Sequence, residues 1–364
     1  FAPSQAAPGQ EFRAVALPVD ANGNAIAGAE GVSVDVPAGG TAEVTPGPRH
    51  SLHIAATVRA EGVARLRLED RENGLVAESN PMRVARAEGP GVYWGEFHCH
   101  GYDGSEINVL NEGTHPDSMY AYGRDVTRLD FVAMGSHIFR QAPHAVDEWW
   151  ELYREAAARY DEEGRYVTFM GCEWRDREDA GGDRNLVWRD LDAPRPDPTW
   201  RIEDLYRILP GQGAVVIPHV GGAIAFPCCH DPRAESLCEM ASGHGNFEWF
   251  AQAYLPKGYR LGLIGGSDGH KGTPGHPRVV GTEGGRFFNL LRRRDGGWLG
   301  GPLLGVYAER LDRHALWEAF RQRHTYASTG ARALLEFRAN DALMGSEIAA
   351  GADVRLSVCV EGTA

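Results

Sequence analysis

Two closely spaced histidines form the most chemically informative pattern in the chain. His98 and His100 flank Cys99, and the segment Ser267-Asp-Gly-His270 follows far downstream. Each group ends a run of residues that is typical of a β-strand. Alternate residues of a strand project to the same face, so both histidines can reach one ion while Phe97 and Cys99 point the other way. Imidazole and carboxylate groups at the ends of different strands predict a catalytic divalent metal site.

The region that contains these residues alternates between strand-like and helix-like segments. This alternation predicts a parallel β/α barrel, in which catalytic groups gather at the carboxyl ends of the strands. The expected strands are Tyr93–His100, Phe131–His137, Tyr166–Glu173, Asn185–Asp190, Ala214–His219, Leu237–Ser242 and Leu261–Asp268. The candidate metal ligands at or just beyond their ends are His98, His100, His137, Glu173, His219, His244, Asp268 and His270. Their joint placement favours a metal cluster over a set of unrelated core histidines.

The clearest helix is expected at residues 146–158. Trp149, Leu152, Tyr153 and Ala156 follow an i, i+3, i+4, i+7 pattern, which places them on one face. We interpret this aromatic face as the surface that packs the helix against the barrel.

Both ends of the chain predict β-structure. Short alternating stretches such as Phe12–Leu17 and Leu52–Val58 are typical of a small antiparallel β-sandwich. A last amphipathic helix, about Arg313–Arg323, precedes expected strands at Leu334–Arg338 and Val354–Val358. We therefore expect an Ig-like β-sandwich domain at residues 1–90, a catalytic β/α barrel at 91–330 and a short C-terminal β extension at 331–364.

Composition narrows the classes of partner. The 364 residues include 37 Lys and Arg against 50 Asp and Glu, a formal net charge of −13. This balance lacks the positive field that holds a nucleic-acid backbone, so nucleic acid is not an expected partner. No apolar run approaches the roughly 20 residues that span a bilayer, and no signal peptide is evident. A soluble chain is expected, either cytoplasmic or periplasmic, whose oligomeric state the sequence does not indicate.

The order of the metal-binding motifs resembles the PHP family, named for polymerase and histidinol phosphatase. The shared motifs are His-x-His, a strand-end His, Gly-x-Glu, Pro-His and Ser-Asp-x-His, which here are His98–His100, His137, Gly171–Glu173, Pro218–His219 and Ser267–His270. More narrowly, the DUF3604 branch is similar at Trp94–His100, Ser242–Glu248, Gly265–Gly275 and Thr325–Gly330. The resemblance implies a distorted seven-stranded barrel that holds two or three metals, and many members hydrolyse phosphoesters.

The resemblance also assigns the candidate ligands to ions. It implies a first metal held by His98, His100, Glu173 and Asp268, with Glu173 bridging to a second metal held by His219. It implies a third metal held by Glu106, His137 and His270, with Asp103 as a competitor for the role of Glu106. A set of nitrogen and oxygen ligands without a thiolate suits Zn, Mn or Fe.

One departure from the family pattern concerns the second metal. Relatives usually place another metal-binding His between the Gly-x-Glu and Pro-His motifs, where this chain has Asp183 and Arg184. Asp183 can bind a hard metal, whereas Arg184 cannot and would offer its guanidinium to a substrate oxyanion. His244 is an alternative replacement for the missing ligand.

These observations favour metal-dependent phosphoester hydrolysis. In this hypothesis, a metal-bridging hydroxide near Glu173 attacks phosphorus while the ions neutralise the developing charge. Asp268 and His270 act through the metals, and Arg184 or Lys271 stabilises the leaving oxygen. The expected substrate is an anionic small molecule or saccharide.

Two alternatives stay open at this point. The same ions can serve hydrolysis of a C–N or C–O bond, or a lyase reaction on an acidic saccharide. The carboxylated Lys that amidohydrolases commonly use is missing, since no Lys occurs between His98 and Lys257. The second alternative is a non-catalytic polymer-binding protein with structural metals, but structural zinc sites usually close with four ligands that commonly include cysteines.

Overall fold

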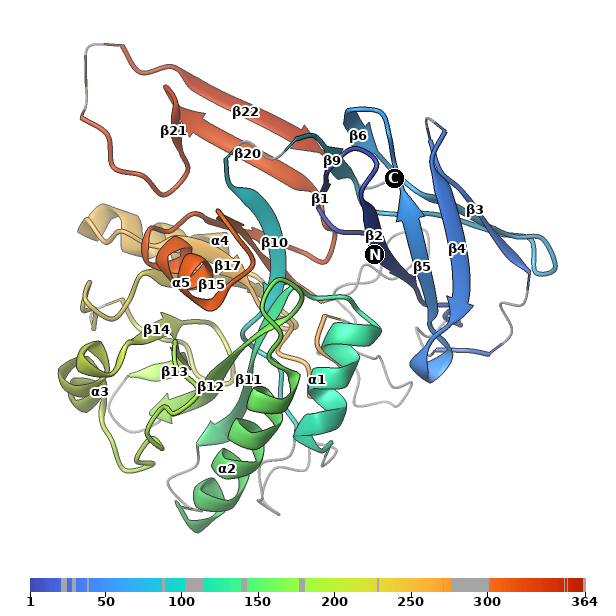
Figure 1. The fold of residues 1–364 in the computed structure, drawn as a ribbon. Coiled ribbons are helices and arrows are strands. Elements are labelled where there is room, and N and C mark those ends of the chain that lie inside the picture. The colour runs from blue at the N-terminus through green and yellow to red at the C-terminus, as the bar shows by residue number, and fades with distance from the viewer. Residues whose placement is uncertain are drawn as a thin grey trace.

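A computed structural model describes the chain except residues 21–24, 28–30, 38, 87–88, 102–113, 139–142, 177–180, 228, 271, 276–300, 350, 352 and 363–364. Figure 1 shows a β-rich N-terminal part on the right, a mixed α/β part on the left and the C-terminal strands above them. The mixed part contains all the candidate metal ligands that the structure describes.

The mixed part is built on a seven-stranded sheet with the strand order β14-β13-β12-β11-β10-β18-β19. Its strands are β10 (Gly91–Glu96), β11 (Phe131–Ile138), β12 (Val167–Asp176), β13 (Gly182–Trp188), β14 (Ala214–Pro218), β18 (Leu303–Ala308) and β19 (Thr325–Ser328). The three central strands β10, β11 and β12 are parallel, and every other neighbouring pair is antiparallel. The carboxyl ends of the parallel strands therefore share one edge.

A second, three-stranded sheet faces this one. It consists of β15 (Leu237–Ser242), β16 (Gly245–Asn246) and β17 (Gly262–Gly265) in the order β16-β15-β17. Strand β15 lies beside β14 and β17 lies beside β19, so the second sheet spans both edges of the first. The main sheet is thus curved into a half-barrel.

The predicted parallel seven-stranded β/α barrel is not confirmed. Strand β12 ends at Asp176 and β13 begins at Gly182, a gap too short for the dozen or more residues that a parallel crossover needs. These two strands consequently form an antiparallel pair. Strand β18, which the sequence analysis did not predict, pairs antiparallel with β10. The sequence analysis ended the first of these two strands at Glu173 and began the second at Asn185, so the predicted connection between them was longer than the observed one.

The inner face of the half-barrel is apolar at one end and polar at the other. On β11, Phe131 and Ala133 share a face with His137, and on β12 Phe169 shares a face with Glu173. The buried apolar residues form one cluster with side chains of helix α5 (Arg313–Arg321). The metal-ligand candidates therefore lie directly above a packed aromatic core.

The position of Phe97 corrects one prediction. Strand β10 ends at Glu96 and the chain bends at Phe97, so the strict alternation that would turn Phe97 away from the histidines is lost. Its ring packs in the inner cluster, 5.0 Å from Phe320 and 5.9 Å from Phe169 between centroids. Cys99 does lie in the other cluster, as expected.

Helices cover the outer face of the main sheet. They are α1 (Pro116–Asp125), α2 (Pro143–Tyr160) and α3 (Ile202–Ile208), while α4 (Glu248–Tyr254) packs on β15. Helix α2 includes the predicted helix 146–158, and its Trp149, Trp150 and Tyr153 are buried. The short 3₁₀ segments are η1 (Pro48–His50), η2 (Leu209–Gln212) and η3 (Leu255–Lys257). No helix within the described residues is long and apolar enough to cross a membrane.

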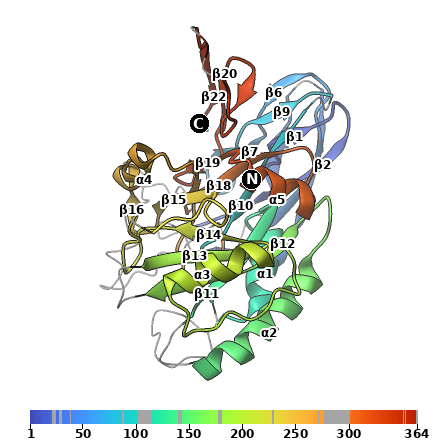
Figure 2. The ribbon, with the colours of Figure 1, turned by 90° about the vertical axis from the view of Figure 1, so that its left-hand side faces the viewer.

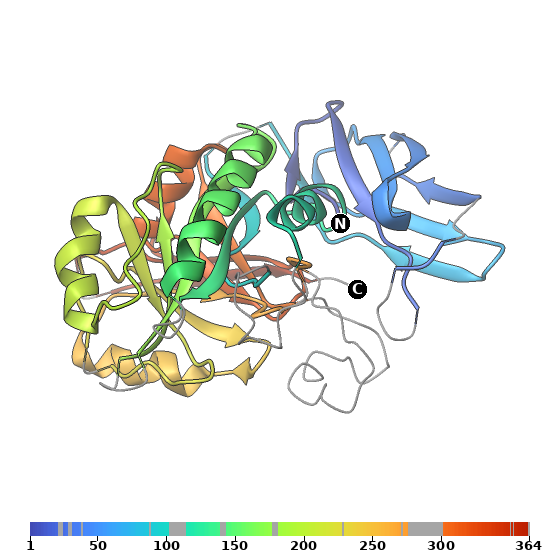
Figure 3. The same ribbon diagram turned by 90° about the horizontal axis from the view of Figure 1, so that it is seen from below.

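The N-terminal part consists of three small sheets around their own apolar core. Its strands are β1 (Gln5–Ala6), β2 (Glu11–Ala16), β3 (Val32–Asp35), β4 (Thr41–Pro46), β5 (Leu52–Thr57), β6 (Gly62–Ala64), β7 (Arg67–Asp70), β8 (Leu75–Glu78) and β9 (Met82–Val84). Figure 3 shows this part beside the mixed part. A buried hydrogen bond of 2.7 Å from Trp94 Nε1 to Ser4 Oγ joins them.

The C-terminal strands form a separate sheet. It contains β20 (Leu334–Ala339), β21 (Ala342–Leu343) and β22 (Leu356–Glu361) in the order β21-β20-β22. Figure 2 shows β20 and β22 projecting beside β6 and β9. Arg83 contacts Glu336 at 3.4 Å, and Arg65 donates to the carbonyl of Gly362 at 2.7 Å, which fixes this placement.

Candidate metal centre

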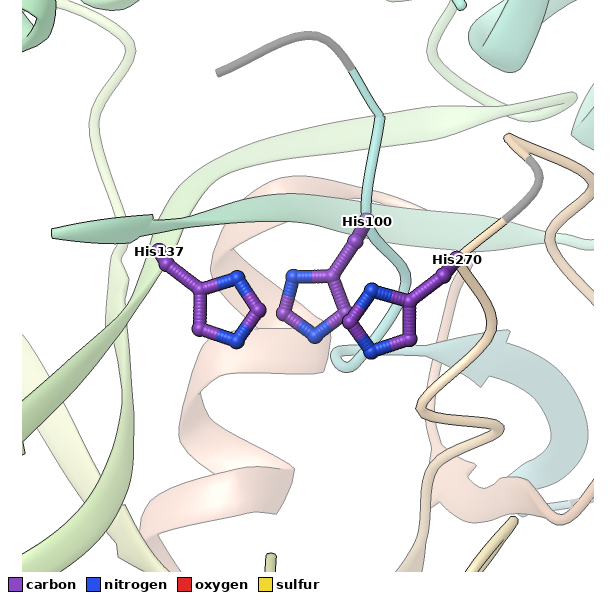
Figure 4. A group of neighbouring side chains, drawn as sticks. All are labelled: His100, His137 and His270. Carbon is purple, nitrogen blue, oxygen red and sulfur yellow. The ribbon is translucent and has the colours of Figure 1, made fainter. Parts of the chain in front are cut away.

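Three imidazole rings stand side by side at the polar end of the half-barrel (Figure 4). The His100 ring lies 4.3 Å from that of His137 and 4.4 Å from that of His270, measured between centroids. His137 comes from the end of β11, whereas His100 and His270 come from adjoining loops. A backbone hydrogen bond of 2.8 Å from His100 N to Gly269 O holds these two loops together. Each ring offers a nitrogen within metal-ligating distance of the other two.

Asp268 lies at the centre of the histidines. Its Oδ1 is 3.3 Å from His98 Nε2, 3.2 Å from His100 Nε2 and 3.3 Å from His270 Nε2, and its Oδ2 is 2.8 Å from His244 Nε2. Asp268 adopts a left-handed backbone conformation with φ of 51°, which is uncommon outside glycine. Its backbone N–H donates to His98 O at 2.7 Å, so the sharp turn after β17 is fixed against the histidine pair.

Glu173 occupies the opposite side of the same cluster. Its Oε2 lies 2.6 Å from His137 Nε2 and 3.4 Å from His100 Nε2, and its Oε1 lies 3.6 Å from His219 Nε2. The carboxylate therefore faces several histidines through both oxygens. A bridging role for this carboxylate is what the family resemblance implies.

Burial and mutual charge decide the protonation of these groups. Burial alone would raise the pKa values of Glu173 and Asp268, but the nearby histidines outweigh burial and hold both pKa values well below the usual range. Burial, aided by the charge of His98, lowers the pKa of His219 to about 3. Burial, together with the charges of neighbouring histidines, also holds the pKa of His100 well below its usual value. His100 and His219 are thus neutral imidazoles beside two carboxylates, the states that bind metals. At His98, burial would lower the pKa, but the carboxylates of Asp268 and Glu239 outweigh burial and raise it well above its usual value.

Several ring nitrogens have no hydrogen bond among the described residues. Both nitrogens of His100, both of His219 and Nε2 of His98 are fully buried without one, although His98 Nε2 and His100 Nε2 lie 3.3 and 3.2 Å from Asp268 Oδ1. Buried polar atoms without partners are costly unless another group satisfies them. Three sets of potential ligands overlap here: His100, His137 and His270; His98, His100 and Glu173; and His98, His219 and Glu239. These donors are of the kinds that divalent metals bind.

Glu239 is a functional candidate that the sequence analysis missed. It lies within β15, almost fully buried, and its oxygens lie 3.0 and 3.1 Å from His98 Nδ1. Asn185 donates to Glu239 at 3.2 Å, and Gly266 leaves no room for a larger residue beside it. A carboxylate that accepts the Nδ1 proton fixes the ring with Nε2 turned to the cluster. Glu239 could have been found from the sequence, because it is the one charged residue of β15 and lies on the same face as Leu237.

The structure corrects the predicted role of Arg184. Strand alternation turns Arg184 away from Glu173, and its side chain is fully buried with Nε 3.3 Å from Glu235. It therefore cannot reach a substrate at the cluster. Arg175 is the guanidinium that lies at the cluster, with Nη2 3.2 Å from Glu173 Oε1.

Asp183 does face the cluster side of β13, but its oxygens are already engaged. Arg175 donates to Oδ1 from Nε at 2.6 Å and to Oδ2 from Nη2 at 2.8 Å. The backbone N–H of Ala223 also donates to Oδ2 at 2.7 Å. Asp183 thus binds an arginine in the position where the sequence analysis considered a metal ligand, while His244 lies against Asp268.

Three residues that the sequence analysis considered cannot be placed. They are Glu106, its competitor Asp103 and Lys271, which lie outside the residues that the structure describes.

Comparisons with known proteins identify one family model and several distant relatives. Residues 251–359 match a family described as "Protein of unknown function (DUF3604)". This match includes the Ser267–His270 motif but not the histidine pair at 98 and 100. Uncharacterised proteins of Chlamydia pneumoniae and Chlamydia muridarum are 22% and 24% identical over 325 and 315 residues, which is 82% and 79% of this chain. The chain spans about half the length of these relatives, 49% and 47%.

One solved structure is also similar. It is a crystal structure of a two-domain protein from Bacteroides vulgatus that contains a predicted PHP-like metal-dependent phosphoesterase. The TM-score is 0.45 and the sequence identity is 20%, with 68% of each chain covered.

Proposed function

We propose that the protein is a metal-dependent hydrolase of the PHP type and that it cleaves a phosphoester. The observation that carries this proposal is the group of buried imidazole nitrogens that lack hydrogen bonds and converge on the two carboxylates Glu173 and Asp268. A structural ion needs one closed set of ligands, whereas here three sets overlap, since His98 and His100 each belong to two of them. Adjacent ions are the arrangement that phosphoester hydrolysis uses.

The ligands divide among two or three divalent ions, for which Zn, Mn and Fe suit the nitrogen and oxygen donors. His98, His100, Glu173 and Asp268 would hold one ion. His219, with Glu173, would hold a second, and His137 with His270 a third. When bound, the ions supply an activated water and neutralise charge that develops on the phosphoryl oxygens.

The protein's own residues set the geometry for this chemistry. Glu239 fixes the tautomer of His98, and the backbone turn at Asp268 places its carboxylate between the histidines. The aromatic core beneath the cluster excludes water from below, which strengthens the electrostatic interactions inside. The substrate we propose is an anionic small molecule or saccharide phosphate.

Activity assays with controlled metal content test this proposal. Protein purified without chelator would be assayed on generic phosphomonoesters and phosphodiesters, then stripped with chelator and reloaded with Zn, Mn or Fe. We expect hydrolysis that disappears on stripping and returns with one of these metals. A metal-loaded protein without activity on either ester class would contradict the phosphoesterase assignment and favour C–N, C–O or lyase chemistry at the same ions.

A further inference from the structure

Among the residues that the structure describes, Arg175 is the cation that contacts the carboxylates of the proposed site, with Nη2 3.2 Å from Glu173. It follows Glu173 by two residues on β12, so both side chains project to the same face, and Arg175 lies nearer the carboxyl end of the strand. The guanidinium therefore lies beside Glu173, toward the carboxyl end of β12. Its side chain is 13% exposed, whereas Glu173 is 2% exposed.

The hydrogen bonds of Arg175 leave one edge of the guanidinium available. Nε and Nη2 donate to the two oxygens of Asp183, and Nη2 also donates to Glu173. These contacts use three of the five N–H groups and fix the plane of the guanidinium. Among the described residues, none accepts a hydrogen bond from Nη1. The Arg175 side chain as a whole is partly exposed.

Gly222 lies beside this edge of the guanidinium. A Cβ atom at position 222 would lie 2.8 Å from Nη2 of Arg175, closer than real Cβ contacts, and 3.0 Å from Nη1, tighter than most of them. The backbone of Gly222 does not adopt a positive φ, so the need for glycine here is one of space. Any side chain at position 222 would therefore crowd the two terminal nitrogens of Arg175.

We propose that the Nη1 edge of Arg175 binds a phosphoryl oxygen of the substrate and so places phosphorus over the Glu173 side of the site. This inference rests on the proposed phosphoesterase function and names the group that recognises the anion. A guanidinium held in place by Asp183 loses little conformational entropy when it binds an oxyanion. Asp183 is accordingly a positioning residue that acts through Arg175.

Binding of inorganic phosphate to the metal-loaded protein tests the proposal without turnover. Calorimetric titration would compare the wild-type protein with Arg175→Met, and elemental analysis would give the metal content of both. We expect the dissociation constant for phosphate to rise by roughly 10- to 100-fold in Arg175→Met, the range for a lost charged hydrogen bond. Arg233→Met is a matched control, because Arg233 also forms a two-oxygen pair with an aspartate but lies in another loop.

Gly222→Ala separates substrate binding from structural support of Glu173. The added methyl group crowds both Nη2 and Nη1 of Arg175 but keeps the charge of the guanidinium, so phosphate binding should weaken with the metal content unchanged. An unchanged dissociation constant in both Arg175→Met and Gly222→Ala would overturn the proposal. So would a metal loss in Arg175→Met combined with normal phosphate binding in Gly222→Ala. A further outcome separates the two proposals. If the wild-type protein hydrolysed no phosphoester but the variants still weakened phosphate binding, the result would support phosphate binding by Arg175 and contradict the proposed reaction.

Discussion

Glu239 and Glu235 are two buried glutamates that each contact a histidine, yet only one of them belongs to the metal centre. Glu239 contacts His98 Nδ1 at 3.0 Å, whereas Glu235 contacts His230 Nδ1 at 2.5 Å, on the outer side of β13 with Arg184. The two carboxylates are equally buried. They therefore provide a matched comparison of a carboxylate that supports the cluster and one that does not.

We predict that Glu239→Gln weakens metal binding by roughly 10- to 100-fold, the usual effect of losing the partner that orients a ligating histidine. The amide cannot accept the Nδ1 proton with the strength of a carboxylate, so the His98 ring loses its preferred tautomer. Competition with a chromogenic chelator measures the affinity. Glu235→Gln should leave metal affinity unchanged in the folded protein; equal affinities in the two variants would show that Glu239 does not orient a ligand.

At the residue scale, motif spacing predicts much of the candidate site. His98, His100, His137, Glu173, His219, His244, Asp268 and His270 are all brought together, because each follows or ends a strand whose carboxyl end lies at the same rim. The predicted role of Arg184 in binding a substrate oxyanion was wrong. The strand was predicted to begin at Asn185 rather than at Gly182, so the sequence did not show which residues of β13 face inward. Strand alternation alone could have predicted that Arg175, two residues after Glu173, projects to the same face.

At the scale of elements, the contact between β10 and β11 depends on a glycine. A Cβ atom at Gly95 would overlap the ring of Phe131 in the inner aromatic cluster. We predict that Gly95→Ala destabilises the protein by about 1–3 kcal/mol through overpacking, as measured by urea unfolding. Gly211, whose added Cβ would meet nothing within 4 Å, is the control, and Gly211→Ala should change stability by less than about 0.5 kcal/mol. Equal effects of the two substitutions would contradict this packing.

The elements themselves were only partly predictable. Helix α2 and strands β11 and β15 follow local periodicity, so their sequences indicate them well. Strand β18 is apolar and short, and its role depends on antiparallel pairing with β10, more than 200 residues earlier in the chain. Periodicity carries no information about such long-range pairing. For this reason the sequence predicted a parallel barrel, whereas the structure has a mixed half-barrel and a second sheet.

At the scale of the whole molecule, hydrogen bonds join the N-terminal sheets to the metal-binding part. Trp94 Nε1 donates to Ser4 Oγ in a buried bond, and Arg128 Nε donates to the carbonyl of Arg13 at 2.8 Å in an exposed one. The division into parts at residues 1–90, 91–330 and 331–364 is our proposal. In this view, the first two parts unfold together.

We predict that Ser4→Ala lowers the free energy of unfolding by about 1–3 kcal/mol, because it leaves the buried Trp94 Nε1 without an acceptor. The loss should shift a single unfolding transition that both near-UV circular dichroism and metal release report. Ser33→Ala is the control, because Ser33 is exposed and its bond to Glu69 O is long at 3.4 Å. Two separate transitions, with only the first affected by Ser4→Ala, would show that the parts unfold independently.

The number of ions that the chain binds tests the central claim most directly. Protein purified without chelator, and protein stripped and reloaded with Zn, Mn or Fe, would be analysed for metal per chain by elemental analysis. Overlapping ligand sets around His98, His100 and Glu173 predict two or more ions per chain with at least one of these metals. At most one ion per chain under every loading condition would contradict the proposed multinuclear centre.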